Sequence, residues 1–240
     1  MNPSQQEQAA RSSSAVSEAN GNEDARRPHS GRAKYITPSL YSSWWFWYNS
    51  DFSVYAGPDE ARDAARKEYL DTLARVPLEP TDAMLRGRDF EGIVRAFLDG
   101  EKPELSAETT LNFGDIDRAR DFAEVLTPEC LWQVPCKTEC AGVVLYGIAD
   151  AVNRGIVYDI KRKSSYDCPA YYDSIQHLVY MRGLDLESFK YLISTSGDIF
   201  CEDYRRDDAL LESRVRGFLS HLDHDREAKD LWLENWEYNK

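Results

Sequence analysis

The first 32 residues of this 240-residue chain contain no phenylalanine, tryptophan or tyrosine, and Ser, Gln, Asn, Glu and Ala dominate them. Such a segment cannot bury enough apolar surface to offset the entropy lost on ordering. Residues 1–33 are therefore predicted to be a disordered tail. The tail also lacks an apolar signal-peptide core, and its acids balance its arginines, so neither a secretory signal nor a transit peptide fits.

The chain also lacks any apolar run of the length needed to span a bilayer, so no membrane partner is expected and the protein is predicted to be soluble and intracellular. It has five cysteines, an odd number, which favours reduced thiols over a disulfide framework. Cys130, Cys136 and Cys140 have a spacing that matches no common zinc site. We expect them to be small buried thiols.

Basic charge is scarce as well. The formal net charge is −13, which argues against a protein that grips nucleic acid through a broad basic face. A local groove, in which metal ions and a few basic residues meet phosphate, remains compatible with this charge.

The rest of the chain has ample core material, with 42% hydrophobic and 12% aromatic residues. Apolar spacing, caps and breakers predict helices over residues 36–51, 57–77, 80–100, 115–125, 169–183 and 207–222. Strands are predicted over 131–139, 142–152, 155–163, 189–196 and 198–204, with a tight turn at Arg154–Gly155. A polar, tryptophan-containing tail follows the last helix. Residues 34–240 are thus predicted to form a single α/β domain, with a central mixed sheet flanked by helices.

Two acids and a lysine interrupt the apolar strands of the predicted hairpin. If Arg154 and Gly155 are the central turn residues, Asp150 lies directly opposite Asp159, and Lys161 points to the same face as Asp159. Like charges in opposite positions are destabilising unless positive charge lies between them. A divalent metal, assisted by Lys161, would supply that charge. The alternative is a surface hairpin with solvated charges, and a register shifted by one residue would separate the acids.

Glu91 is another candidate acid. Its spacing from Met84, Val94 and Leu98 places it on the inward side of the third predicted helix. Charged residues are rarely buried without a partner. Glu91 is therefore either a site residue or a boundary glutamate paired with Arg88 or Arg95, and its helix position alone favours the second.

Two further clusters have ordinary explanations. The aromatic stretch "WWFWY" could stack exposed bases, but packing against the core is the better explanation. His221 and His224 are three residues apart on the last predicted helix. The neighbouring Asp223 and Asp225 favour a solvated surface there over a metal site.

Four short motifs follow one another along the chain: Gly87-Arg-Asp-Phe-Glu91, Gly147-Ile-Ala-Asp150, Asp159-Ile-Lys161 and Gln176-His-Leu-Val-Tyr180. In this order, on a helix, two strands and a helix, they resemble the PD-(D/E)xK nuclease superfamily and its RecB-like and phage-type exonuclease branch. "TPSLYSSW" also looks like the first helix of such domains. The resemblance covers about residues 35–225 and implies a restriction-endonuclease-like core. Glu91 stands where many members have histidine.

The resemblance implies a Mg²⁺ site, in which Mn²⁺ is expected to substitute. Its protein ligands would be Glu91, Asp150, Asp159 and the carbonyl of Ile160, because Mg²⁺ prefers oxygen ligands. Lys161 would position the attacking water and stabilise developing charge. The substrate-binding candidates are Gln176, Tyr180, Lys163 and Arg162, although Tyr180 is equally explained by packing on the sheet. No iron–sulfur cluster is expected, because no cysteine precedes Cys130.

The function implied is a metal-dependent deoxyribonuclease, an exonuclease serving DNA recombination, repair or phage DNA processing. Its partners would be DNA and a recombination or single-strand-binding protein, in bacterial or phage cytoplasm. The alternative is a catalytically silent nucleic-acid-binding or assembly module that keeps the fold. A hydrolase acting on another phosphodiester is a weaker option. Strand polarity, strand preference, the number of metals and the oligomeric state stay open.

Overall fold

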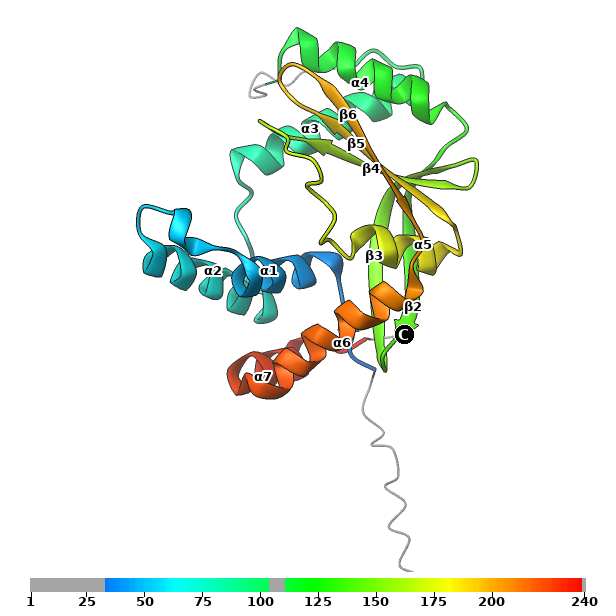
Figure 1. The fold of residues 1–240 in the computed structure, drawn as a ribbon. Coiled ribbons are helices and arrows are strands. Elements are labelled where there is room, and N and C mark those ends of the chain that lie inside the picture. The colour runs from blue at the N-terminus through cyan, green and yellow to red at the C-terminus, as the bar shows by residue number, and fades with distance from the viewer. Residues whose placement is uncertain (1–32, 104–110, 239–240) are drawn as a thin grey trace, which may run out of the picture. The chain divides into compact units, whose positions relative to one another are not determined.

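The computed structural model describes residues 33–103 and 111–238 (Figure 1). The predicted tail, residues 1–33, lies outside this part of the chain except for Ala33. The helices are α1 (Pro38–Asn49), α2 (Pro58–Leu73), α3 (Asp82–Leu98), α4 (Phe113–Leu126), α5 (Gln176–Leu184), α6 (Asp208–His224) and α7 (Arg226–Asn235), with a short 3₁₀ turn at Phe52–Val54. The strands are β1 (Tyr35–Ile36), β2 (Leu131–Cys140), β3 (Val143–Asn153), β4 (Ile156–Arg162), β5 (Ser188–Ser194) and β6 (Ile199–Arg205).

All six of these strands form one mixed sheet, in the order β1-β3-β4-β5-β6, with β2 paired to β3. β2, β3 and β4 form an antiparallel meander, and α5 connects β4 to its parallel neighbour β5. β6 runs antiparallel to β5. This is the predicted α/β architecture, a central mixed sheet flanked by helices.

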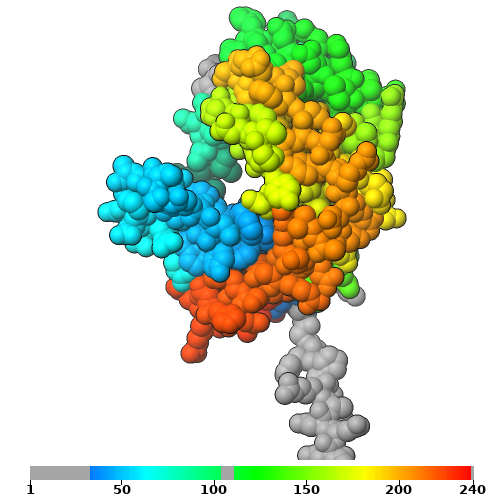
Figure 2. Space-filling model, in the orientation of Figure 1, coloured from blue at the N-terminus to red at the C-terminus, as the bar shows by residue number. Residues whose placement is uncertain are grey.

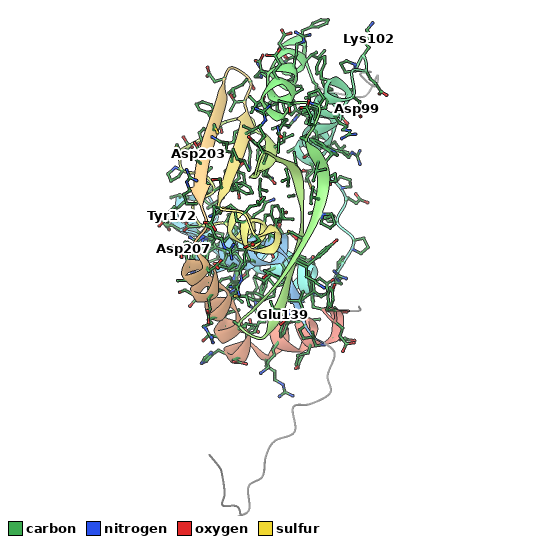
Figure 3. The ribbon with its side chains drawn as sticks, turned by 90° about the vertical axis from the view of Figure 1, so that its right-hand side faces the viewer. Asp99, Lys102, Glu139, Tyr172, Asp203 and Asp207 are labelled. Atoms are coloured by element: carbon green, nitrogen blue, oxygen red, sulfur yellow. The ribbon has the colours of Figure 1, made fainter. Side chains whose placement is uncertain are left out.

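Helices cover the sheet on both sides because adjacent strand residues point to opposite faces. Tyr158 and Ile160 of β4 pack into a core cluster with α3 and α4. Val157 of β4 belongs to a second cluster, which includes α1, α2, α5, α6 and α7. Figure 3 shows Asp99, after α3, at one end of the sheet and Glu139 at the other, near α6 and α7. Asp159 is next to Ile160 in β4, so its side chain points to the opposite face of the sheet, where it meets α5.

Local sequence signals set several boundaries as predicted. The hydroxyls of Thr37 and Thr81 cap α1 and α3 by accepting hydrogen bonds from backbone N–H groups three residues later. Arg154 and Gly155 both have positive φ, at 48° and 76°, as a two-residue hairpin turn requires. The predicted hairpin turn is therefore confirmed.

The helix predicted over 169–183 is wrong in its first half. Its α-helical part begins only at Gln176, because the preceding backbone groups bind other partners. The Ala170 N–H donates to the Glu202 carboxylate at 2.8 Å, and the Gln176 N–H donates to the Ser174 hydroxyl at 3.1 Å. The Cys168–Pro169 peptide is cis. We call residues 163–175 the connecting segment.

Two elements were missed at the chain ends. β1 has only two residues, and its parallel pairing with Val144 and Leu145 of β3 leaves no periodic signal. The predicted polar tail is in fact α7, whose Trp232 is buried and is followed by the equally buried Trp236. The Trp236 indole donates to the Leu73 carbonyl at 2.9 Å, which ties this end of the chain to α2.

Three further predictions concern the cysteines, the histidines and membrane-spanning segments. Cys130, Cys136 and Cys140 are buried free thiols, as predicted. His221 is not on a solvated surface, since its ring lies among Trp44, Trp47, Tyr48 and Tyr69. In the described part of the chain, no helix has both the length and the apolar character to cross a bilayer.

Candidate functional site

The β3–β4 hairpin brings Asp150 and Asp159 together. Its register pairs Val152 with Val157 and Asn153 with Ile156, as predicted. The ladder continues to Ala151–Tyr158, one step before the two acids. Asp150 then turns its carboxylate to the backbone of β4, where Oδ2 accepts a hydrogen bond from the Ile160 N–H at 2.8 Å.

β3 is free of regular pairing on both sides at Asp150. The β2–β3 register runs from Trp132–Ala151 to Val134–Ala149 and skips the pair between them. The residue of β2 at that point, Gln133, has φ of +52°, a conformation that is unusual for a non-glycine residue in a strand. This interruption is a local distortion that lets the Asp150 side chain reach the Ile160 N–H.

Asp159 lies at the centre of the polar cluster and is almost fully buried, with 1% of its surface exposed. Its Oδ2 forms an ion pair with the Lys161 ammonium, two residues along the same face of β4. Its Oδ1 accepts a hydrogen bond from the Gln176 amide at 2.6 Å. Both carboxylate oxygens of Asp159 therefore contact a positively polarised group.

Gln176 is held in turn by Tyr180, one helical turn further along α5. The Gln176 amide lies 3.2 Å from the Tyr180 hydroxyl, so one amide group bridges Asp159 and Tyr180. The resemblance implies that Gln176 contacts the lysine or DNA; in the structure its amide contacts Asp159, the ion-pair partner of Lys161. Tyr180 is buried, which matches the packing alternative.

Gly147 explains how the Tyr180 ring fits against β3. A Cβ at position 147 would lie 2.4 Å from Cε1 of Tyr180. No real side chain tolerates such a contact, so the ring occupies the space that the glycine leaves. The first residue of the Gly147–Asp150 motif thus makes room for the last residue of the Gln176–Tyr180 motif.

Glu91 of α3 is half-buried and lies near this cluster. Burial raises the pKa of its carboxyl to about 7; Lys161 opposes this rise and Asp159 adds to it. Arg95, one of the partners considered for Glu91, forms its ion pair with Asp99 at 2.7 Å. The charges of Lys161 and Asp159 therefore act on the Glu91 carboxyl group, while Arg95 is bound to Asp99.

The cluster holds more acid than base. Burial raises the pKa of Asp150, and the neighbouring Asp159 raises it further. Burial also raises the pKa of Asp159, although Lys161 opposes the effect. Burial would lower the pKa of Lys161, but Asp159 and Asp150 outweigh it, so the pKa rises and the ammonium stays charged. One ammonium thus serves three carboxyl groups, and their raised pKa values reflect the cost of ionising all three in one place.

The two basic residues after Lys161 differ in what they contact. Arg162 donates to Asp115 of α4 at 2.7 Å, and its side chain is only 9% exposed. Arg162 thus ties α4 to β4 and does not present its charge to solvent. Lys163 is exposed, and its ammonium lies 5.7 Å from the centre of the Tyr171 ring.

A cavity of about 350 Å³ opens beside Lys161 and Gln176. α1 contributes one wall, with Trp45 and Phe46, and the connecting segment contributes another, with Tyr171. A second cavity of about 380 Å³, lined by Gly147 and Tyr180 among others, shares Ser42 and Gln176 with the first. Figure 2 shows this face hollowed between α1, α3 and the connecting segment.

Sequence reasoning missed Tyr171, Ser174 and Asp115. Tyr171 and Ser174 line the cavity but were assigned to a helix, so no loop residue was considered there. Asp115 is buried and binds Arg118 as well as Arg162. Its one signal was its position three residues after Asn112, which caps α4 in a reciprocal capping box.

In the described ranges, no three His, Cys, Asp or Glu side chains are already arranged around a point where a metal ion could bind. The donor chemistry nevertheless fits a hard divalent cation, because Glu91, Asp150 and Asp159 offer only oxygen atoms. Their raised pKa values fit it as well, because a nearby cation favours the ionised form of each carboxyl group. Lys161 holds Asp159, so a metal would compete with that ion pair.

Comparisons with known proteins give limited information. No protein-family model matches the chain, and no curated protein matches it. Among solved structures, it is similar to LHK-Exo in complex with dAMP, with 18% identity over 82% of this chain and 94% of the other and a TM-score of 0.42. It is also similar to a phage-related exonuclease from Haemophilus somnus 129PT, with 12% identity, 85% and 95% coverage and a TM-score of 0.39. It is similar to SSO0001 as well, with 16% identity over 81% of this chain and 79% of the other and a TM-score of 0.44.

Proposed function

We propose that this chain is a metal-dependent deoxyribonuclease of the PD-(D/E)xK type, acting as an exonuclease. The observation that carries the proposal is the convergence of Asp150, Asp159 and Lys161 beside a cavity, with Gln176 bound to Asp159. Three motifs that are separate in the sequence supply these residues, and Glu91 of the remaining motif lies within their electrostatic influence.

In this proposal Asp150, Asp159 and Glu91, with the Ile160 carbonyl, hold Mg²⁺ or Mn²⁺. When bound, the metal would lower the pKa of a water molecule and neutralise charge on the phosphate. With Asp159 holding the metal, Lys161 would share this carboxylate with the ion. Its ammonium, which stays protonated, would orient the attacking water and stabilise charge that develops on the phosphate. Gln176 keeps the Asp159 carboxylate in one orientation.

The direct test is degradation of labelled linear DNA in the presence of Mg²⁺ or Mn²⁺. We expect Asp159→Asn and Lys161→Ala to lower the rate about a hundredfold or more, since the first removes a proposed metal ligand and the second removes positive charge that the transition state needs. Lys190 and Asp203 are a matched control, because they form an exposed Lys–Asp ion pair on β5 and β6. Lys190→Ala and Asp203→Asn should retain the wild-type rate. An inactive wild type, or equal loss in both pairs, would overturn the proposal.

Closed circular DNA distinguishes exonuclease from endonuclease activity. An exonuclease requires a strand end, so we expect the linear form to be degraded and the closed circle to stay intact. Digestion of the circle at a similar rate would replace the exonuclease proposal by an endonuclease. The same assay with added single-strand-binding protein tests the proposed role in recombination, repair or phage DNA processing.

A second candidate is a catalytically silent nucleic-acid-binding module. It is favoured by the ion pair between Lys161 and Asp159, which satisfies the aspartate without a metal, and by the net charge of −13. Calorimetry separates the two candidates. A nuclease should bind Mg²⁺ or Mn²⁺, with affinity lost in Asp159→Asn, whereas a silent module should show no binding that depends on Asp159.

A further inference from the structure

The cavity beside Lys161 has aromatic walls that the proposed chemistry does not use. Trp45 and Phe46 contribute from α1, and Tyr171 contributes from the connecting segment. Phe46 is 44% exposed although it is apolar. Side chains of the aromatic stretch thus point in different directions: Trp44 packs in the core, whereas Trp45 and Phe46 line the cavity.

Two of these rings are supported from behind by other aromatic rings. Trp45 stacks on the buried Tyr41, with 5.9 Å between ring centres and 16° between planes. Tyr171 stacks on the buried Tyr191, with 4.2 Å and 20°. A ring that is fixed in this way loses little conformational entropy when a flat ligand stacks against it. Trp45 and Tyr171 are therefore preorganised to stack against a planar ligand.

The connecting segment that carries Tyr171 is also fixed. The buried Glu202 carboxylate accepts hydrogen bonds from the Tyr166 hydroxyl at 2.6 Å and from the Ala170 N–H at 2.8 Å. On the other side of Tyr171, the Arg214 guanidinium donates to the carbonyls of Tyr172 and Ser174, both at 2.9 Å. Tyr171 thus lies between two anchored points.

The charge of the cavity argues against a site for phosphate groups alone. Its one lysine, Lys161, is paired with Asp159, and its one acid, Asp173, lies 3.7 Å from Arg214. The other polar side chains of the lining are neutral: Ser42, Ser50, Ser174 and Gln176, with the Tyr171 hydroxyl and the Trp45 indole N–H. Aromatic faces with neutral hydrogen-bonding groups suit a nucleobase better than an anion.

We propose that this cavity is a subsite for one unpaired nucleobase, which stacks on Trp45, Phe46 or Tyr171 while its phosphate lies at Lys161. The inference deepens the proposed function and rests on it for the position of the phosphate. A base inside a duplex is stacked on its neighbours, so only an unpaired base at or near a strand end reaches these rings. The preferred substrate is therefore a single-stranded end.

The experiment measures binding of short single-stranded oligonucleotides in EDTA, where no cleavage occurs. An abasic residue replaces each nucleotide near the end in turn, which removes the base and keeps the phosphate. For wild type, one position should weaken binding about tenfold, the loss expected when one stacked base is removed. This arm uses the unaltered protein and does not depend on how a variant folds.

The variants test which rings are responsible. Trp45→Ala and Tyr171→Ala should each weaken binding of the intact strand up to about tenfold and should lose little more at the abasic position. Trp45→Phe and Tyr171→Phe keep a ring and should bind nearly as wild type. Tyr48→Ala is the matched control, because Tyr48 is an exposed aromatic residue of α1 that does not line the cavity.

Two results would overturn the subsite. One is equal binding of intact and abasic strands at every position, and the other is the same loss in Trp45→Ala and Tyr48→Ala. A cleavage assay with Mg²⁺ keeps the two proposals apart. If wild type cleaves DNA but ignores the abasic residue, the subsite fails and the nuclease stands. If base-dependent binding occurs without cleavage, the subsite stands and the nuclease fails.

Discussion

Gly147 and Tyr180 show how a motif residue acts through packing. The glycine leaves room for the tyrosine ring, the tyrosine hydroxyl contacts the Gln176 amide, and the amide holds Asp159. Three of the four motif residues in this chain of contacts need not touch a substrate. Gly147, Tyr180 and Gln176 together hold the Asp159 carboxylate in place.

Gly147→Ala is expected to destabilise the protein, whereas Gly87→Ala is not. A Cβ at position 147 forces the Tyr180 ring to move, and such overpacking costs about 1–3 kcal/mol. A Cβ at Gly87 meets nothing within 4 Å in the interior of α3, where alanine is favoured over glycine by roughly 0.5–1 kcal/mol. Urea unfolding measures both changes. Equal midpoints for the two variants would contradict this account of Gly147.

The sequence predicted the hairpin that carries Asp150 and Asp159 better than the contacts of the side chains around it. The period of the strands and the Arg154–Gly155 turn were enough to place Asp150 near Asp159, because register in a tight hairpin is set by the turn. The contact of Gln176 with Asp159 depends on where α5 begins. That boundary is set by the tertiary contacts of the connecting segment, which no local pattern encodes.

At the scale of elements, α4 is anchored to the end of β4 by one buried acid. The Asp115 carboxylate binds Arg118 at 2.8 Å and Arg162 at 2.7 Å, and it accepts from the Asn112 N–H at 3.0 Å. Burial tends to raise the pKa of Asp115, but these hydrogen bonds outweigh it and lower the pKa. The carboxylate is therefore ionised and fully partnered.

Asp115→Ala is expected to lower the free energy of unfolding by about 3–5 kcal/mol, because two mostly buried guanidinium groups lose their partner. Asp117 is the matched control on the same helix, since its ion pair with Arg120 is exposed and is worth about 0–1 kcal/mol. Urea unfolding of Asp115→Ala and Asp117→Ala tests the difference. Hydrogen exchange should quicken first in α4. A small effect at Asp115 would show that α4 is held by its apolar contacts alone.

The elements also show where local patterns suffice. Helices with strong caps and an apolar face, such as α1 and α3, were predicted within a few residues. α7 was missed because its polar surface resembles a loop, although Trp232 and Trp236 bury its inner side. β1 exists through two pairings with β3, and a strand of two residues has no period to detect.

At the scale of the whole molecule, the larger core cluster joins five helices to one face of the sheet, and a buried histidine lies within it. His177 of α5 is 2% exposed, stacks on Tyr204 at 4.1 Å, and has no hydrogen-bond partner at Nδ1. Burial, together with the nearby charge of Arg214, lowers its pKa to about 3. Protonation of this ring in the folded core is therefore disfavoured until the pH falls to about 3.

His177 should make the folded state sensitive to acid. Its ordinary pKa is about 6.5 and its folded pKa is about 3, so the unfolded chain binds the proton first. The stability that depends on neutral His177 is complete above pH 6.5 and is lost as the pH falls from 6.5 toward 3. At pH 4.5, two units below 6.5, the loss is about 2.7 kcal/mol.

The measurement compares urea unfolding of wild type and His177→Phe at pH 7 and at pH 4.5. Carboxylates contribute equally to both proteins, so the difference between them isolates the histidine. The phenylalanine ring can fit the buried site less well than histidine and so lower the free energy of unfolding, but this effect does not change with pH because the ring does not titrate. The wild-type advantage should therefore shrink, or the wild-type deficit grow, by about 2–3 kcal/mol on acidification. A difference that does not change with pH would show that His177 accepts its proton within the folded core.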